Sequence, residues 1–333
     1  MKHVILFGGS FDPIHNGHLN MALRALDERK ADELWFIPNQ VSPFKSDVTP
    51  FKNRLEMIEL VLGIDSRFKV LDIEGKQEGP SYTIDTVLSI KKDHPDIKFD
   101  FLIGDDHIEF LEQWKNFKQL EKEIQFIVYG RNDIEHKYPQ INGEIMNVSS
   151  SKIRIGESTE TSSDVLRYIV EHSLYMHTIL QNRLSTYRYE HVLRVCDLAL
   201  ELGKHHNLDL QRIKIAALWH DYAKEDKNLK EYIQKYLPEC LDYPDAFYHA
   251  FVAADVLERR YKFHDQEVLE AIYYHVDGAS DNDIAKVLYI ADKCEPNRPF
   301  DTSKFVNLAK QDLNLGFQEL KKNQEEYLGG SNE

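Results

Sequence analysis

Imidazole and carboxylate side chains recur along the second half of this 333-residue chain at intervals that suit a metal centre. The landmarks are His191, the adjacent pair His220 and Asp221, His249, His275 and Asp292. Each interval is long enough for one helix and its connection, so successive helices of a bundle can each present a ligand to a common centre. This donor set suits iron, manganese or zinc, and an aspartate next to a histidine can bridge two ions.

A second group of residues that could bind phosphate and take part in catalysis follows a strand-like run near the N-terminus. The run His3–Phe7 leads into Gly8-Gly9-Ser10-Phe11, and His15-Asn16-Gly17-His18 comes directly afterwards. Glycines after a strand let the backbone approach a ligand, and the start of the following helix favours phosphate. Two imidazoles at this place can donate hydrogen bonds to phosphoryl oxygens and stabilise charge on a pentavalent transition state.

Two kinds of secondary structure must position these groups. In the first half, strands are expected at 4–7, 34–37, 68–73, 99–103 and 124–129, alternating with helices at 17–31, 51–62 and 81–92. Strands alternating with helices of this length predict βαβ units and a parallel sheet covered on both faces. From about Asn182 onward, apolar residues recur with helical spacing, as in Val192, Val195, Ala199 and Leu202. This pattern predicts an all-α bundle.

The length favours two domains. Because the composition shifts between Ser173 and Asn182, we expect a first domain over residues 1–175 and a second over 182–315. Residues 316–333 are expected to form a helix end and a polar tail.

Composition excludes some classes of partner. The formal net charge is −15, and the parts before and after Tyr175 are both acidic, at −8 and −7. Neither part offers the basic surface that nucleic acid requires. The longest apolar runs fall well short of the ~18 residues of a membrane span. Three scattered cysteines without a CxxC pair predict free thiols in the cytoplasm.

The residues from Gly8 to His18 resemble the HxGH motif of the nucleotidyltransferase superfamily, and more narrowly that of bacterial nicotinate-mononucleotide adenylyltransferases. Four further segments match that family in order, namely 42–45, 79–86, 104–106 and 148–154. The chain departs from the family at Phe44, where histidine is usual, at Asp105, where a small residue is usual, and after Arg131. The resemblance implies a Rossmann-like α/β fold that transfers AMP from ATP to nicotinate mononucleotide, giving deamido-NAD and pyrophosphate.

The same resemblance implies roles for single residues. Those implied in catalysis are His15, His18, Lys45 and Arg154. Those implied in binding ATP, which carries Mg²⁺, are Gly8, Gly9, Ser10, Phe11, His18, Asp106, Ser150, Ser151 and Arg154. Those implied in binding the nicotinate nucleotide are Lys45, Tyr82, Thr83, Trp114 and Arg131, with Trp114 stacked on the pyridine ring.

The segments 187–191, 220–225, 274–278 and 290–298 resemble HD-domain metal-dependent phosphohydrolases, and more closely the YqeK family. That family implies symmetrical cleavage of diadenosine tetraphosphate into two ADP, with attack at a β-phosphorus. The resemblance assigns one ion to His191, His220, Asp221 and Asp292, and a second to Asp221, His249 and His275. It implies iron, although the ligand set also accepts manganese. Asp221 and Lys224 would be catalytic, and Lys224 and Arg298 would bind substrate phosphates.

Alternatives stay open for both domains. The first could use nicotinamide mononucleotide, phosphopantetheine or another adenylyl acceptor. The second could be a different nucleotide phosphohydrolase, or a metal-stabilised regulatory module. The complete ligand set together with Lys224 favours an enzyme. The oligomeric state is open, with a homo-oligomer among the options.

Overall fold

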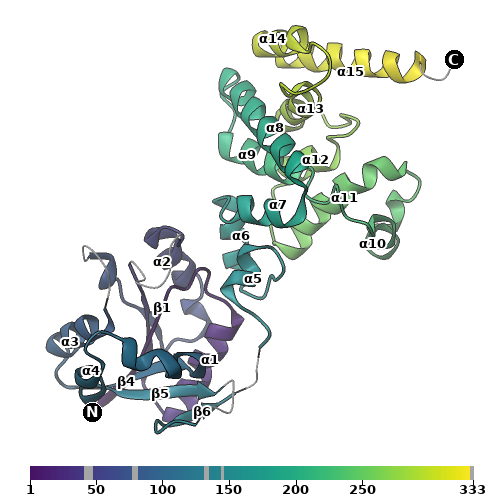
Figure 1. The fold of residues 1–333 in the computed structure, drawn as a ribbon. Coiled ribbons are helices and arrows are strands. Elements are labelled where there is room, and N and C mark those ends of the chain that lie inside the picture. The colour runs from purple at the N-terminus through teal and green to yellow at the C-terminus, as the bar shows by residue number, and fades with distance from the viewer. Residues whose placement is uncertain (41–47, 77–81, 131–134, 144–145, 331–333) are drawn as a thin grey trace. The chain divides into compact units, whose positions relative to one another are not determined.

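The computed structural model describes residues 1–40, 48–76, 82–130, 135–143 and 146–330 (Figure 1). The chain divides into two compact units, Met1–Val165 and Leu166–Glu333. This division lies before the composition shift, because Leu166 and Val170 share a hydrophobic cluster with the helices that follow. Helix periodicity alone does not show which unit such a helix packs against.

The first unit is built on a parallel sheet, as the alternation of strands and helices predicts. Its strand order is β3-β2-β1-β4-β5-β6, and every pair of neighbours is parallel. The strands are β1 (Lys2–Gly9), β2 (Glu33–Pro38), β3 (Phe68–Val70), β4 (Ile97–Gly104), β5 (Gln125–Gly130) and β6 (Gln140–Asn142). The helices are α1 (Asn16–Arg29), α2 (Phe51–Glu59), α3 (Thr83–Asp93), α4 (Phe117–Glu123) and α5 (Ser150–Arg154).

Alternate residues of the central strand enter two separate layers of packing. Val4 and Leu6 belong to a buried cluster that includes Ile84, Val87 and Ile90 of α3. The alternate residues Ile5 and Phe7 point to the opposite face and are also buried. Burial on both faces explains why the strand reads as a continuous apolar run.

The strand order reverses between β1 and β4. β1 pairs with β2 on one side and with β4 on the other, so that Gly8 lies opposite Ile37, and Phe7 lies opposite Leu102. Doubly wound sheets bind their ligands at this switch point, beyond the carboxyl ends of the strands. Gly8 and Gly9 end β1 and Gly104 ends β4, so the segments that follow both strands leave the sheet there.

The second unit is helical throughout its described residues, as predicted. Its helices are α6 (Ser163–Glu171, which begins just before the division), α7 (Met176–Arg183), α8 (Thr186–His205), α9 (Leu210–Trp219), α10 (Leu229–Tyr236), α11 (Tyr248–Asp255), α12 (Gln266–Tyr273), α13 (Asp283–Cys294), α14 (Ser303–Gln311) and α15 (Leu313–Gly330). α8 packs on α9 and α13, and α12 packs on α9, α11 and α13. Among the described residues, no helix combines the length and apolar character needed to cross a membrane.

Candidate active sites

His15 and His18 lie face to face at the start of α1. Their rings stack with centroids 3.7 Å apart and an interplanar angle of 25°. The His15 amide donates to Nδ1 of His18 over 3.3 Å, so a neutral His18 carries its proton on Nε2 and can donate it to a phosphoryl oxygen. Gly17 permits this packing, because a Cβ there would lie 3.1 Å from both the His15 ring and Val148.

Helix α5 brings two of the predicted ATP-binding residues, Ser150 and Arg154, onto the loop that precedes His15. The Ser150 hydroxyl donates to the Pro13 carbonyl at 2.9 Å, and the Arg154 guanidinium donates to the Asp12 carbonyl at 2.6 Å. Arg154 also lies 3.4 Å from the hydroxyl of Ser151. The structure therefore gathers hydroxyl and guanidinium donors beside the histidine pair, although about 140 residues separate them along the chain.

The predicted residues for the pyridine nucleotide lie at the edge of the core. Trp114 is half-buried and packs edge-on against Phe101 and Phe126, with ring centroids 6.2 Å apart in each case. Tyr82, also half-buried, precedes α3 and has the Lys115 ammonium 4.1 Å from its ring centre. Core contacts fix the orientation of the tryptophan and leave part of it accessible to a ligand.

Asp106 lies just beyond the carboxyl end of β4. Its carboxylate folds back over Gly104, where a Cβ would collide with it. Asp106 is exposed, whereas its neighbour Asp105 is buried. Lys45 and Arg131 lie outside the described residues, so their roles stay predictions.

Arg54 is a residue of this unit that the sequence analysis missed. Its side chain is only 1% exposed, yet its guanidinium donates to the carbonyls of Ser10, Asn39 and Thr49 at 2.8 Å each. Arg54 thereby ties the loop after β1 to the described residues on both sides of 41–47. An isolated arginine in a helical pattern gives no hint of this, because its partners are spread along the chain.

The six predicted metal ligands converge in the helical unit. One group consists of His191, His220 and Asp292, and the other of Asp221, His249 and His275. In each group, one nitrogen or oxygen atom per residue lies within 4.8 Å of the others. All six side chains are buried. The spacing along the sequence therefore predicted a real cluster of donors.

Asp221 faces the two groups with different oxygens. Its Oδ2 lies 3.7 Å from Nε2 of His191 and 3.6 Å from Nε2 of His220. Its Oδ1 lies 3.3 Å from Nε2 of His249 and 3.8 Å from Nε2 of His275. A carboxylate placed in this way can serve one cation with each oxygen, as the adjacent histidine and aspartate predict.

Hydrogen bonds on the outer ring nitrogens prepare two of these histidines for a cation. Nδ1 of His220 donates to the Ala217 carbonyl, and Nδ1 of His275 donates to the Ile272 carbonyl, both at 2.7 Å. The proton is thus held on Nδ1, and the lone pair of Nε2 is turned toward the centre. Nε2 of His220 is buried without a hydrogen-bond partner among the described residues. A cation would satisfy this atom, so the donors fit a metal.

The protonation states also suit a metal. Burial lowers the pKa of His220 and lowers that of His275 strongly, which keeps both imidazoles neutral. Burial alone would raise the pKa of Asp292, but the Lys293 ammonium and the hydrogen bond with His191 hold it well below its ordinary value. Neutral imidazole and ionised carboxylate are the forms that bind metal ions.

The two predicted phosphate-binding cations lie at this centre and contact its ligands. Nζ of Lys224 is 3.1 Å from Nε2 of His249, and burial lowers the pKa of this ammonium. The guanidinium of Arg298 lies 3.1 Å from Oδ1 of Asp292 and also donates to its backbone carbonyl. Both side chains are therefore close enough to the donor groups to meet a phosphate bound there.

Two further contacts to the ligands were not predicted from the sequence. The guanidinium of Arg188 lies 3.0 Å from Oδ2 of Asp221. The carboxylate of Glu295 lies 3.3 Å from Nδ1 of His191. Both residues occur within the segments that resemble HD hydrolases, but the sequence gives no signal of which ligand each one contacts.

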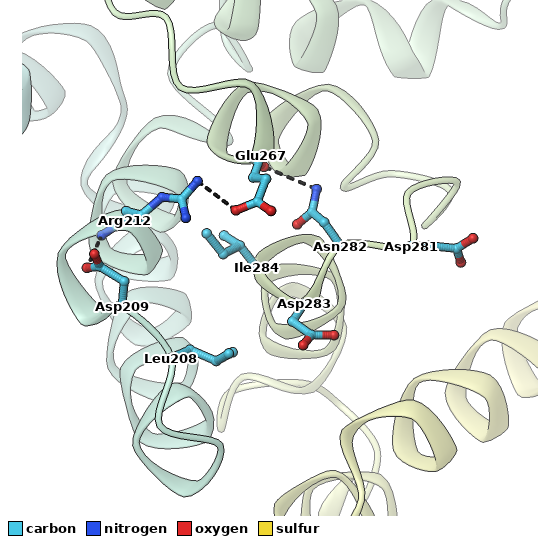
Figure 2. Close-up of a pocket in the computed structure, with 8 residues that line it drawn as sticks. All are labelled: Leu208, Asp209, Arg212, Glu267, Asp281, Asn282, Asp283 and Ile284. Carbon is cyan, nitrogen blue, oxygen red and sulfur yellow. Dashed lines mark hydrogen bonds and ion pairs between the residues drawn. The ribbon is translucent and has the colours of Figure 1, made fainter.

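A separate surface pocket of about 320 Å³ lies at the N-terminal ends of α9, α12 and α13 (Figure 2). It is lined by Leu208, Asp209, Arg212, Glu267, Asp281, Asn282, Asp283 and Ile284. Figure 2 shows Arg212 reaching toward Glu267, 2.7 Å away, and Arg212 also pairs with Asp265. The predicted metal ligands of the same helices lie at or just beyond their C-terminal ends, so the pocket is distinct from the cluster of metal-binding donors.

A parallel sheet with an HxGH loop at its switch point, followed by a buried centre of histidines and aspartates, defines a nucleotidyltransferase-type unit joined to an HD-type unit. Residues 6–156 match the Cytidylyltransferase-like family, and residues 188–297 match the HD domain. A Mycoplasma pneumoniae protein named probable nicotinate-nucleotide adenylyltransferase/Ap4A hydrolase is 31% identical over 94% of this chain and 96% of its own length. The chain belongs to this family of two-domain proteins.

Two other similarities each cover one part of the chain. The nicotinate-nucleotide adenylyltransferase of Bacillus subtilis is 39% identical, over 53% of this chain and 99% of its own length. A solved structure from Clostridium acetobutylicum, described as a predicted HD superfamily hydrolase involved in NAD metabolism, is 27% identical. It covers 47% of this chain and 87% of its own, with a TM-score of 0.43.

Proposed function

We propose that the first unit transfers the AMP moiety of ATP to nicotinate mononucleotide, forming deamido-NAD and releasing pyrophosphate. The observation that carries this proposal is the stacked pair His15 and His18 at the switch point, with Ser150 and Arg154 docked on the same loop. The phosphate of the mononucleotide attacks the α-phosphorus of ATP directly. The protein then needs no nucleophile of its own, because positioning and charge stabilisation perform the catalysis.

Each of the residues at the site has a separate role in binding or catalysis. Nε2 of His18 donates to the phosphoryl group under attack, and Arg154 neutralises charge on the triphosphate together with the Mg²⁺ that accompanies ATP. Trp114 and Tyr82 at the core edge contact the pyridine ring. The relatives named for the nicotinate nucleotide support this acceptor over nicotinamide mononucleotide or phosphopantetheine.

Replacement of His18 tests the proposal for the first unit. His18→Ala removes a donor to the transition state, so kcat of adenylyl transfer should fall by ~10²–10³. His94→Ala changes an exposed histidine of the same unit and should leave kcat unchanged. A His18→Ala enzyme that retains kcat within a few-fold of the wild type contradicts the assignment.

We also propose that the helical unit hydrolyses diadenosine tetraphosphate symmetrically to two ADP, with two iron or manganese ions as cofactors. The carrying observation is that Asp221 presents one oxygen to each donor group. When bound, the two ions neutralise phosphate charge and make water more acidic. His191, His220 and Asp292 would hold one ion, His249 and His275 the other, and Asp221 both. Lys224 and Arg298 would contact the polyphosphate.

Metal analysis and product analysis test this second proposal together. The full chain should bind two divalent ions and convert diadenosine tetraphosphate into ADP alone. ATP plus AMP as products would contradict symmetrical cleavage. Bound metal without any turnover would instead indicate a regulatory module. A cytoplasmic location, a homo-oligomeric state and the absence of nucleic-acid and membrane partners stay predictions from the sequence.

A further inference from the structure

The imidazole of His191 lies between two carboxylates that come from the same helix end. Its Nε2 is 3.1 Å from Oδ1 of Asp292, and its Nδ1 is 3.3 Å from Oε1 of Glu295. These acids stand three residues apart, at the end of α13 and directly after it. Glu295 is only 3% exposed, so its carboxylate has little contact with water and depends on protein partners.

The position of His191 explains why a side chain, and not a backbone carbonyl, accepts the hydrogen bond from its Nδ1. His220 and His275 stand at or just beyond helix ends, where backbone carbonyls lack helical partners and can accept from Nδ1. His191 instead lies within α8, on its second turn, where the nearby carbonyls accept helical hydrogen bonds. An acceptor for its Nδ1 must therefore come from another element, and Glu295 supplies it.

Glu295 is itself held in place by two donors. Nε of Arg194 donates to Oε2 of Glu295 at 2.7 Å, and the Asn297 amide donates to the same oxygen at 2.9 Å. Arg194 stands one turn after His191 on α8, so the two residues share a helix face. One carboxylate oxygen is thus anchored while the other faces the imidazole.

We infer that Glu295 is a positioning residue of the metal centre. When an ion is bound at Nε2, the Glu295 carboxylate would hold the proton of His191 on Nδ1, fix the ring and strengthen Nε2 as a ligand of the ion shared with His220 and Asp292. Glu295 contacts neither substrate nor the second donor group in this assignment. The inference rests on the proposed metal centre, and it adds that the two ions depend on Glu295 unequally.

Manganese binding by the full chain tests the inference, with free Mn²⁺ measured by electron paramagnetic resonance. Glu295→Gln keeps the size of the side chain but removes its charge. One of the two ions should bind about 10–100-fold more weakly, since partners of metal-bound histidines have effects of this size. The other ion should bind as in the wild type. Glu190→Gln is the matched control, because Glu190 lies 3.8 Å from Arg194 and is exposed. It should bind both ions normally.

The possible outcomes distinguish the role of Glu295 from the proposed metal centre on which it rests. Wild-type protein that binds no Mn²⁺ overturns both. Wild-type binding of two ions with unchanged affinities in Glu295→Gln overturns only the role of Glu295. An equal loss at both sites, with a lower melting temperature of the metal-free protein, shows a general structural role and also overturns it. Arg194→Met should weaken the same single ion by a smaller factor, because it loosens Glu295 without removing its charge.

Discussion

Oδ1 of Asp221 lies 3.3 Å from Nε2 of His249, while Oδ2 of the same carboxylate faces the other pair of histidines. Asp221 belongs to the donor group of His249 and His275 and also lies within 3.7 Å of both histidines of the other group, whereas each histidine belongs to a single group. Loss of Asp221 should therefore affect the binding of both ions, whereas loss of one histidine should affect only one.

Metal content should reveal the difference. His249→Ala should retain the ion held by the other group, and its metal content should fall from about two ions per chain to about one. Asp221→Asn should lose most of both, because a neutral amide cannot bridge two cations. His264→Ala, an exposed histidine of the same unit, should behave as the wild type. Equal metal content in the Asp221 and His249 variants would contradict the shared-ligand geometry.

Trp114 should affect one substrate of the first unit more than the other. Stacking on the pyridine ring contributes about 1 kcal/mol beyond contact area, which corresponds to roughly a five-fold effect on binding. Trp114→Ala should therefore raise KM for nicotinate mononucleotide by at least this factor and change KM for ATP less. Trp114→Phe keeps a ring and should lose less. Equal increases in both KM values would show that Trp114 only packs against Phe101 and Phe126.

Arg54 should matter for stability as well as for adenylyl transfer. Arg54→Met leaves three half-buried carbonyls without their donor, so the free energy of unfolding should fall by about 3 kcal/mol. Adenylyl transfer should fall too, since the loop after β1 loses its anchor, while hydrolysis by the helical unit stays unchanged. Urea unfolding and both assays check this. Arg54→Lys should restore part of the stability, and a change below about 0.5 kcal/mol for Arg54→Met would contradict the role.

Asp265 should make the helical unit sensitive to acid. Burial alone would raise the pKa of Asp265, but its carboxylate accepts from Arg212 at 2.5 and 2.7 Å and from the Val268 amide, and these bonds together hold the pKa below its ordinary value. Its stabilising contribution is therefore present above the unfolded pKa of about 3.9 and is lost as pH falls through the lower folded value.

Asp265→Asn tests this predicted pH dependence of the stability. The free energy of unfolding in urea should drop by about 1–2 kcal/mol at pH 7, and the gap to the wild type should narrow below about pH 4. Asp281→Asn, at an exposed position in the pocket that Arg212 also lines, is the control and should match the wild type. A gap that stays constant with pH would mean that the charge of Asp265 contributes nothing.

The elements that carry the donors could be predicted from the sequence because each depends on a local pattern. The apolar run of β1 and the spaced apolar residues of α8 follow from strand and helix geometry. β6 was not predicted, since only Ile141 of its three residues is apolar and its pairing with β5 is a tertiary contact.

The site was predictable where residues act in adjacent or motif-like positions. The adjacency of His220 and Asp221 predicts a shared ligand. Arg54 and Glu295 could not be predicted in this way, because each acts through hydrogen bonds to distant segments. No local pattern encodes which carbonyl or imidazole such a buried charge will meet.

The most direct test of the whole account measures both reactions in the same three proteins. Wild-type chain, His18→Ala and Asp221→Asn should each be assayed for deamido-NAD formation and for ADP release from diadenosine tetraphosphate. We predict that the wild type performs both reactions, that His18→Ala loses only the first, and that Asp221→Asn loses only the second. Loss of both reactions in either variant that remains folded would contradict two separate active sites in one chain.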